Sequence, residues 1–202
     1  VVFADTADYD GDGTQESFVA AGEYDGAFGA PVCDLWYVTE SGATLLKESL
    51  PIRDVSRYGL GKTSLYLLEG YGIGGAGDVL YCVWEGQARQ LLEGAGRIEV
   101  SHNGDLTAWD LQEGDRPSYY FYSEGTAAQY PLRTADAEKL LEFDNGQAVY
   151  DSLLLWEPER IDCVRYDNGV WEVTAVLDNG AAFYQILEER ELPRALRLPA
   201  FL

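Results

Sequence analysis

Val79-Leu80-Tyr81-Cys82-Val83-Trp84-Glu85-Gly86 sets six apolar residues directly before a Glu-Gly pair. β-Branched and aromatic side chains favour strands, and glycine permits the positive φ angle of a tight turn. The same pattern recurs in Leu35–Gly42 and Ser118–Gly125, and more faintly in Asp162–Gly169. These segments predict strands that end at hairpin turns, and therefore an all-β protein.

The turn glycines of these four segments, Gly42, Gly86, Gly125 and Gly169, are spaced by 44, 39 and 44 residues. This spacing is about the length of a four-stranded propeller blade. One small sheet cannot bury both of its faces alone, so successive sheets must stack. We therefore expect a β-propeller-like array of about four small antiparallel sheets; a β-sandwich, or part of a larger propeller, stays open. The expected organisation is a single β domain, 1–202, with approximate units 1–49, 50–93, 94–133 and 134–190 and a C-terminal segment 191–202.

Period-2 alternation and turn residues mark the individual elements. Asn-Gly pairs at 103–104, 168–169 and 179–180 predict tight hairpins, because both residues tolerate positive φ angles. One helix is expected over Ala135–Phe143, capped by Thr134 and stopped by Asp144-Asn145-Gly146. The strands expected most clearly are 17–21, 34–39, 43–48, 64–69, 79–84, 97–101, 106–111, 119–123, 126–131, 161–166, 170–177 and 181–187.

The charge of the chain excludes several functions. Its 202 residues include 14 lysines and arginines against 35 aspartates and glutamates, a formal net charge of −21. Such a surface repels phosphate backbones and anionic lipid headgroups, so we expect neither nucleic-acid binding nor membrane-surface binding. No apolar run approaches the ~20 residues of a spanning helix. Because the chain has no methionine, we expect that Val1 is not the natural start and that any signal peptide or anchor precedes it.

Sequence motifs give little sign of catalysis. The three cysteines, Cys33, Cys82 and Cys163, form no CxxC pair, so zinc is not indicated and buried free thiols are expected. The only histidine, His102, stands in a predicted turn and offers no basis for a nucleophilic triad. A pair of acids for glycoside hydrolysis would exist somewhere among 35 carboxylates, so its presence is uninformative.

One motif carries chemistry: Asp8-Tyr9-Asp10-Gly11-Asp12-Gly13-Thr14-Gln15-Glu16. Its first, third and fifth residues are aspartates, which a tightly curled loop would point inward. Gly13 permits a sharp turn, after which the Thr14 carbonyl faces the same centre and Glu16 can add a further oxygen. Six to eight hard oxygen ligands are what Ca²⁺ requires. The motif therefore predicts a calcium site rather than a site for softer metals, which prefer histidine or cysteine.

The flanking residues argue against an EF-hand. That motif requires a bidentate glutamate at the twelfth loop position, which here is Val19. Moreover, residues 17–21 are expected to form a strand and not the exiting helix of an EF-hand. The alternative is a solvated acidic turn without metal, which four carboxylates in nine residues disfavour because they repel one another.

An Asp-rich loop that closes at its ninth residue and leads into a strand resembles the calcium loops of integrin-type FG-GAP repeats and the related VCBS repeats. The resemblance covers residues 8–22. In those families the loop binds calcium between two propeller strands, at the millimolar calcium found outside cells. The resemblance implies a secreted or cell-surface protein with these ligands: side chains of Asp8, Asp10, Asp12 and Glu16, and the backbone of Thr14.

Two functions follow as hypotheses. The first is a non-enzymatic extracellular calcium-binding β module, in which calcium is structural and the module binds a protein or a glycan. The second is a carbohydrate-active enzyme that uses an unidentified pair of Asp or Glu residues. The absence of catalytic motifs favours the first.

Overall fold

The predicted all-β class is confirmed. A computed structural model describes residues 1–71, 77–94, 96–101, 104–110, 116–143 and 145–188, and these are mostly strands in three antiparallel sheets of seven, four and four strands. The described chain separates into two compact units, one of residues 1–129 and one that begins at Tyr130. Each sheet is open in the part of the chain that the structure describes. The propeller-like arrangement and the single-domain organisation stay predictions.

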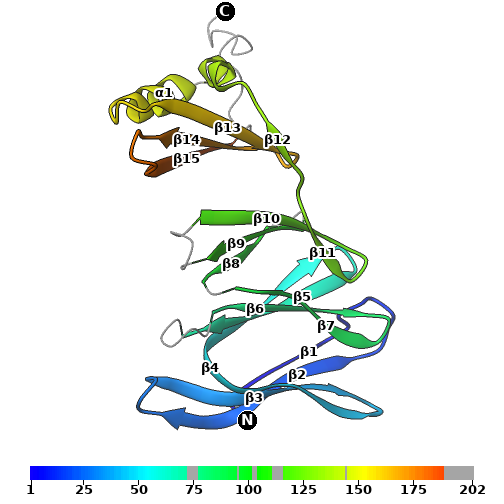
Figure 1. The fold of residues 1–202 in the computed structure, drawn as a ribbon. Helices are drawn as coiled ribbons and strands as arrows, with labels where there is room; N and C mark the ends of the chain where they lie inside the picture. Colours follow the sequence, from blue (N-terminus) through cyan, green and yellow to red (C-terminus); the bar gives the residue numbers. More distant parts are fainter. Residues whose placement is uncertain (72–76, 95, 102–103, 111–115, 144, 189–202) are drawn as a thin grey trace, which may run out of the picture. The chain divides into compact units, whose positions relative to one another are not determined.

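The largest sheet joins the first two predicted units (Figure 1). Its central strand β4 pairs with β3 through residues up to Pro51 and with β5 from Ile52 onward. The sequence predicts about four sheets, and the described residues form three, because no turn interrupts the chain between Gly42 and Leu60. The strands follow sequence order: β1 (Phe3–Ala7), β2 (Glu16–Asp25), β3 (Ala30–Thr39), β4 (Gly42–Leu60), β5 (Thr63–Gly70), β6 (Val79–Trp84) and β7 (Gln87–Glu93).

Strands β5 and β6 are buried on both faces. One face packs against β2 and β3 in a core that includes Phe18, Leu35 and Tyr66. The opposite face, which includes Leu65 and Leu80, packs against the second sheet. Burial on both sides explains why these strands are continuous apolar runs. The second sheet has the order β11-β10-β9-β8, formed by β8 (Ile98–Val100), β9 (Asp105–Asp110), β10 (Arg116–Ser123) and β11 (Thr126–Gln129).

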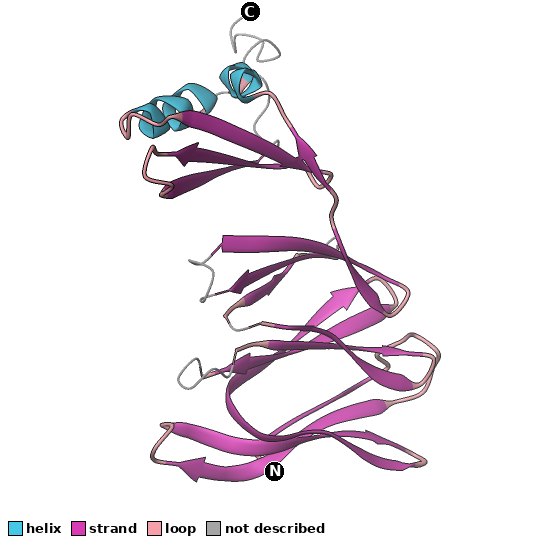
Figure 2. Cartoon of the chain, in the orientation of Figure 1, coloured by secondary structure: helices cyan, strands magenta, loops and turns pink. Residues whose placement is uncertain are grey.

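The second unit is a four-stranded sheet with both described helices (Figure 2). The 3₁₀ helix η2 (Ala137–Glu142) and the α-helix α1 (Gly146–Leu154) pack on the sheet through Leu140, Phe143 and Leu153, against Trp171 and Val173 among others. The strands are β12 (Leu132–Thr134), β13 (Arg160–Tyr166), β14 (Val170–Val176) and β15 (Ala182–Glu188).

The helix prediction was wrong in three details. The helix that begins near Ala135 is a short 3₁₀ helix, and its cap is Asp136, whose carboxylate accepts the N–H of Glu138. Thr134 instead ends β12. Gly146 begins α1 rather than stopping a helix: a Cβ there would lie 1.4 Å from the Leu140 carbonyl oxygen, so only glycine fits.

The other local predictions hold where the structure describes them. Each strand predicted from the alternation pattern is present, with ends shifted by a few residues at most except where β2, β3 and β4 run longer. Gly169 and Gly180 turn with φ angles of +83° and +81°. All three cysteines are free and buried, as expected. His102, Asn103, Leu111, Asp144 and the segment 189–202 lie outside the described residues.

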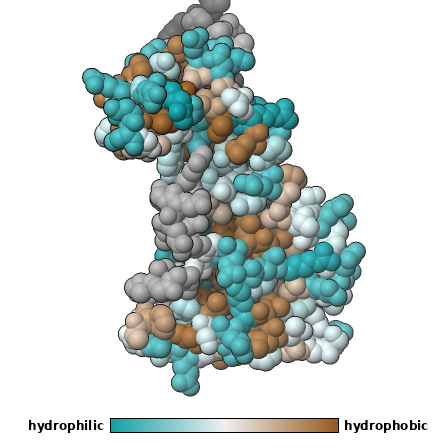
Figure 3. Space-filling model, viewed as in Figure 1, coloured by the Kyte–Doolittle hydropathy of each residue, from teal (hydrophilic) through white to brown (hydrophobic). Residues whose placement is uncertain are grey.

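No helix among the described residues is long and apolar enough to cross a membrane. On the face of the first unit seen in Figure 3, apolar residues show between rows of polar ones.

Candidate metal centre

The acidic motif forms the hairpin loop between β1 and β2. Ala7 pairs with Glu16 at the base of the loop, and the chain continues from Glu16 as a strand, as the sequence predicted. Tyr9 anchors the loop, because its side chain is fully buried and packs edge-on against Phe18 at 5.0 Å between ring centroids. The Tyr9 carbonyl also accepts the N–H of Ser64 at 2.8 Å. The loop is therefore tied to the core of the first unit.

Within the loop, carboxylates accept backbone N–H groups. Asp8 accepts from Gly11 at 2.7 Å and from Gly13 at 3.0 Å, one bond to each carboxylate oxygen. Asp10 accepts from Asp12 at 3.2 Å. These bonds curl the loop tightly. Gly11 has a φ angle of +79°, and a Cβ there would lie 2.7 Å from the Lys62 carbonyl oxygen, so the loop also requires glycine at this position.

Three of the four predicted carboxylates come together. Asp8, Asp10 and Glu16 each offer one oxygen, and these oxygens lie within 4.8 Å of one another. Asp12 is exposed and stands outside this group; its carboxylate accepts the N–H of Thr14 at 2.6 Å. Thr14 is exposed as well. The structure thus brings Asp8, Asp10 and Glu16 together, and we call them the carboxylate cluster.

Glu16 is the buried member of the cluster, with 1% of its surface exposed. Its Oε2 accepts the Tyr9 N–H at 2.9 Å. Burial raises the pKa of Glu16 above its ordinary value, and the neighbouring charges of Asp10, Asp12 and Asp8 raise it further, against the effect of the Tyr9 hydrogen bond. Repulsion among its negative charges therefore destabilises the ionised cluster unless a positive charge is nearby.

Asp10 connects the loop to the turn between β6 and β7. Its Oδ2 accepts the N–H of Gly86 at 3.0 Å, across 76 residues of sequence. The Gly86 carbonyl in turn accepts the Tyr37 hydroxyl at 3.3 Å. Burial, together with the charges of Glu16, Asp10 and Asp12, raises the pKa of Tyr37 to about 12, so this hydroxyl stays a donor at neutral pH.

The donor set of the cluster suits a hard divalent cation. Every ligand atom is a carboxylate oxygen, and an oxygen that accepts one N–H keeps a second lone pair for an ion. Burial of Glu16 gives such an ion one ligand shielded from water, while the half-buried Asp8 and Asp10 leave it an open side.

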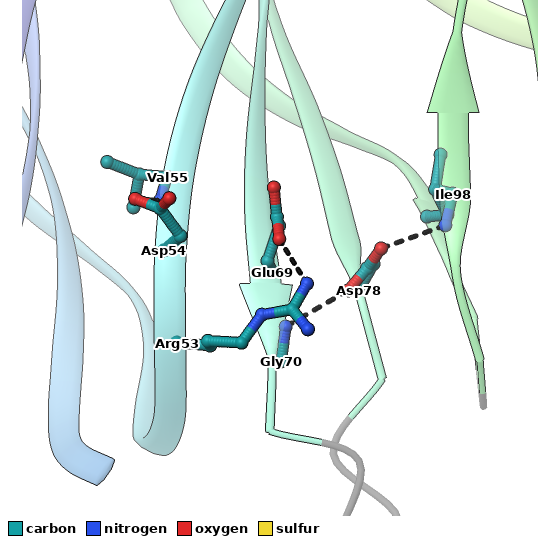
Figure 4. Close-up of polar contacts among 7 residues, drawn as sticks. All are labelled: Arg53, Asp54, Val55, Glu69, Gly70, Asp78 and Ile98. Atoms are coloured by element: carbon teal, nitrogen blue, oxygen red, sulfur yellow. Dashed lines mark hydrogen bonds and ion pairs between the residues drawn. The ribbon is translucent and has the colours of Figure 1, made fainter.

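Sequence reasoning missed a second unusual carboxylate, Asp78 (Figure 4). Only 6% of it is exposed, and its two oxygens accept the N–H of Gly70 at 3.0 Å and of Ile98 at 2.9 Å. Burial raises its pKa, while the two hydrogen bonds and Arg53 lower it and Glu69 raises it. Its signal in the sequence is an acid directly before the apolar run of β6.

Comparisons with protein-family models, with curated proteins and with solved structures find no match to this chain.

Proposed function

We propose that this protein is a non-enzymatic β module whose β1–β2 loop binds Ca²⁺, and that the ion has a structural role. The observation that carries the proposal is the carboxylate cluster, in which oxygens of Asp8, Asp10 and Glu16 lie within 4.8 Å of one another. Three negative charges at this separation repel one another unless a cation neutralises them. Asp12 and the Thr14 carbonyl, on the same loop, are the proposed additional ligands.

The structural role follows from the contacts around the cluster. The loop already contacts the core through Tyr9 and the β6–β7 turn through the bond between Asp10 and Gly86. A cation held by Asp10 and Glu16 would fix this turn, the loop and the start of β2 in one arrangement. The resemblance of residues 8–22 to FG-GAP and VCBS calcium loops supports the proposal, since there too the loop joins two strands. Loops of extracellular modules bind calcium at about 10⁻⁴–10⁻³ M, so a secreted or cell-surface setting is part of the proposal.

Calorimetry of thermal unfolding in millimolar CaCl₂ and in EGTA tests the proposal. Calcium should raise the Tm of the wild type, since an ion that binds only the folded state stabilises it by about 0.4–1.4 kcal/mol at one to ten times its Kd, the range that millimolar calcium covers for such loops. The variant Asp10→Asn should lose this response. Magnesium should produce a smaller shift, because it demands a stricter octahedral site.

The matched control is Asp25→Asn. Asp25 also accepts a loop N–H, that of Ala27 at 2.8 Å, but it is the last residue of β2 and lies outside the cluster. It should keep the full calcium response. A wild-type Tm that is equal in calcium and in EGTA would overturn the proposal and indicate a solvated acidic turn.

A further inference from the structure

A groove lies between two hairpin turns of the first unit. Its volume is about 480 Å³, within the range of about 300–1,000 Å³ typical of small-molecule sites. One wall is formed by Thr39 and residues 41–44, from the end of β3 to the start of β4, and the other by residues 86–88, from the β6–β7 turn to the start of β7. The two turns belong to opposite halves of the seven-stranded sheet, so only the fold brings them together.

The groove is lined by uncharged groups. Its hydroxyls come from Tyr37, Thr39, Ser41 and Thr44, and its amide comes from Gln87. Its apolar surface comes from Leu46 and from alanines on both walls. None of the described residues that line it carries a charge, although the protein has a net charge of −21.

The polar groups are held in place and keep bonding capacity. The Thr39 and Ser41 hydroxyls are 2.7 Å apart, and the Ser41 N–H donates to the Thr39 hydroxyl at 3.2 Å. The Tyr37 hydroxyl donates to the Gly86 carbonyl. A hydroxyl has one donor and two acceptor sites, so the Thr39 hydroxyl, which takes part in three such bonds, is fully engaged. The Tyr37 and Ser41 hydroxyls, with one bond each, keep sites for a ligand.

This lining selects a chemical class of ligand. An anion would find no positive partner in the groove, and a purely apolar ligand would leave several hydroxyls without water or a partner. A ligand that offers many hydroxyl groups and small apolar patches matches both kinds of surface. We propose that this groove binds a short neutral saccharide. The inference goes beyond the proposed function, because it assigns a ligand to a groove that the calcium role does not involve.

Isothermal titration calorimetry in millimolar CaCl₂ tests the inference with a panel of neutral trisaccharides: cellotriose, maltotriose, laminaritriose, mannotriose and triacetylchitotriose. At least one should bind with one-to-one stoichiometry. Ala43→Trp places a large side chain in the groove from an exposed position, and Gln87→Ala removes the amide from an exposed position. Both should weaken binding at least tenfold. Circular dichroism of each variant shows whether it is folded.

The controls repeat each substitution outside the groove. Ala182→Trp changes an exposed alanine on β15, and Gln90→Ala changes an exposed glutamine on β7 itself. Both should bind the saccharide as the wild type does. No heat of binding with any trisaccharide, or binding that the two groove variants leave unchanged, would overturn the inference.

The two proposals fail separately. The calcium response of the Tm reports on the loop, and the saccharide titration reports on the groove. If calcium raises the Tm but no saccharide binds, only the saccharide proposal is overturned. If a saccharide binds but calcium leaves the Tm unchanged, only the calcium proposal is overturned.

Discussion

Glu16 and Asp78 are two carboxylates buried in the same unit, and the chain surrounds them in opposite ways. Both oxygens of Asp78 accept backbone N–H groups, from the end of β5 and the start of β8, and the Arg53–Glu69 ion pair lies close by (Figure 4). Glu16 has one backbone donor, and its charged neighbours are Asp8, Asp10 and Asp12.

These two environments show what the burial of a charge requires. A buried carboxylate is tolerated when hydrogen bonds replace its lost water, and Asp78 obtains these from the protein alone. It therefore serves as a connection between two sheets. Glu16 obtains less from the protein and stands among like charges, so its environment favours a bound cation.

The largest effect expected from this comparison is that of Asp78→Ala. The substitution leaves the Gly70 and Ile98 N–H groups without their acceptor. Each unsatisfied donor costs about 1–3 kcal/mol, so we expect a loss of about 2–6 kcal/mol in the free energy of unfolding. Urea denaturation followed by circular dichroism measures it. Glu69→Ala, which breaks only the partly exposed pair with Arg53, should cost less than about 1 kcal/mol. Equal losses of unfolding free energy in the two variants would show that the hydrogen bonds of Asp78 do not connect the two sheets.

A smaller loss is expected from Gly11→Ala in the acidic loop. The φ angle of +79° costs a non-glycine residue about 1–2 kcal/mol, and the new Cβ would also meet the Lys62 carbonyl oxygen at 2.7 Å. Gly13→Ala is the matched change, since Gly13 has a φ angle of +95° but no atom within 4 Å of its added Cβ. We expect a lower Tm for Gly11→Ala than for Gly13→Ala. The reverse order would mean that the contact with Lys62 does not shape the loop.

Glu16→Gln should act in the opposite direction to Asp78→Ala when calcium is absent. Its amide oxygen can still accept the Tyr9 N–H, while the buried charge among three aspartates is gone. In EGTA we expect a gain of about 0.5–2 kcal/mol, as for other relieved charge clusters. In calcium the variant should show no further gain. A less stable variant in EGTA would indicate that the protein satisfies the Glu16 charge without a cation.

The smallest effect is a pH dependence from Asp78. Its pKa is raised in the folded state, so the folded protein holds this proton to a higher pH than the unfolded chain does. Stability from this group therefore falls as pH rises from the ordinary aspartate value, about 3.9, through the raised folded value, by at most about 1.4 kcal/mol per pH unit. Asp78→Asn should lack this component. Parallel stability curves for the two proteins over mildly acidic pH would contradict it.

Much of the fold was readable from local sequence because strands and turns depend on neighbouring residues. Apolar runs such as Val79–Trp84 and the Asn-Gly turn at 168–169 identify hairpins without knowledge of their partners. The sequence predicted the helical region less accurately. Gly146 resembles a helix stop in sequence, and only the closeness of the Leu140 carbonyl, a contact outside the local pattern, makes it the start of α1.

The candidate site, too, has features that local sequence predicts and features that it does not. The spacing of Asp8, Asp10 and Glu16 was sufficient to predict that they converge, because a short hairpin loop brings its own side chains and the first residue of the next strand together. The exposed position of Asp12, the bond between Asp10 and Gly86, and the part played by Asp78 were not predictable, since each depends on which segment packs against which.

The all-β class, the hairpins and the acidic loop are encoded in local sequence, because they follow from interactions over a few residues. Packing between distant segments is what makes β4 join two predicted units into one sheet, buries β5 and β6 on both faces, and gives Glu16 and Asp78 such different surroundings. Burial and charge environment come from contacts between segments far apart in the chain, which local patterns do not contain.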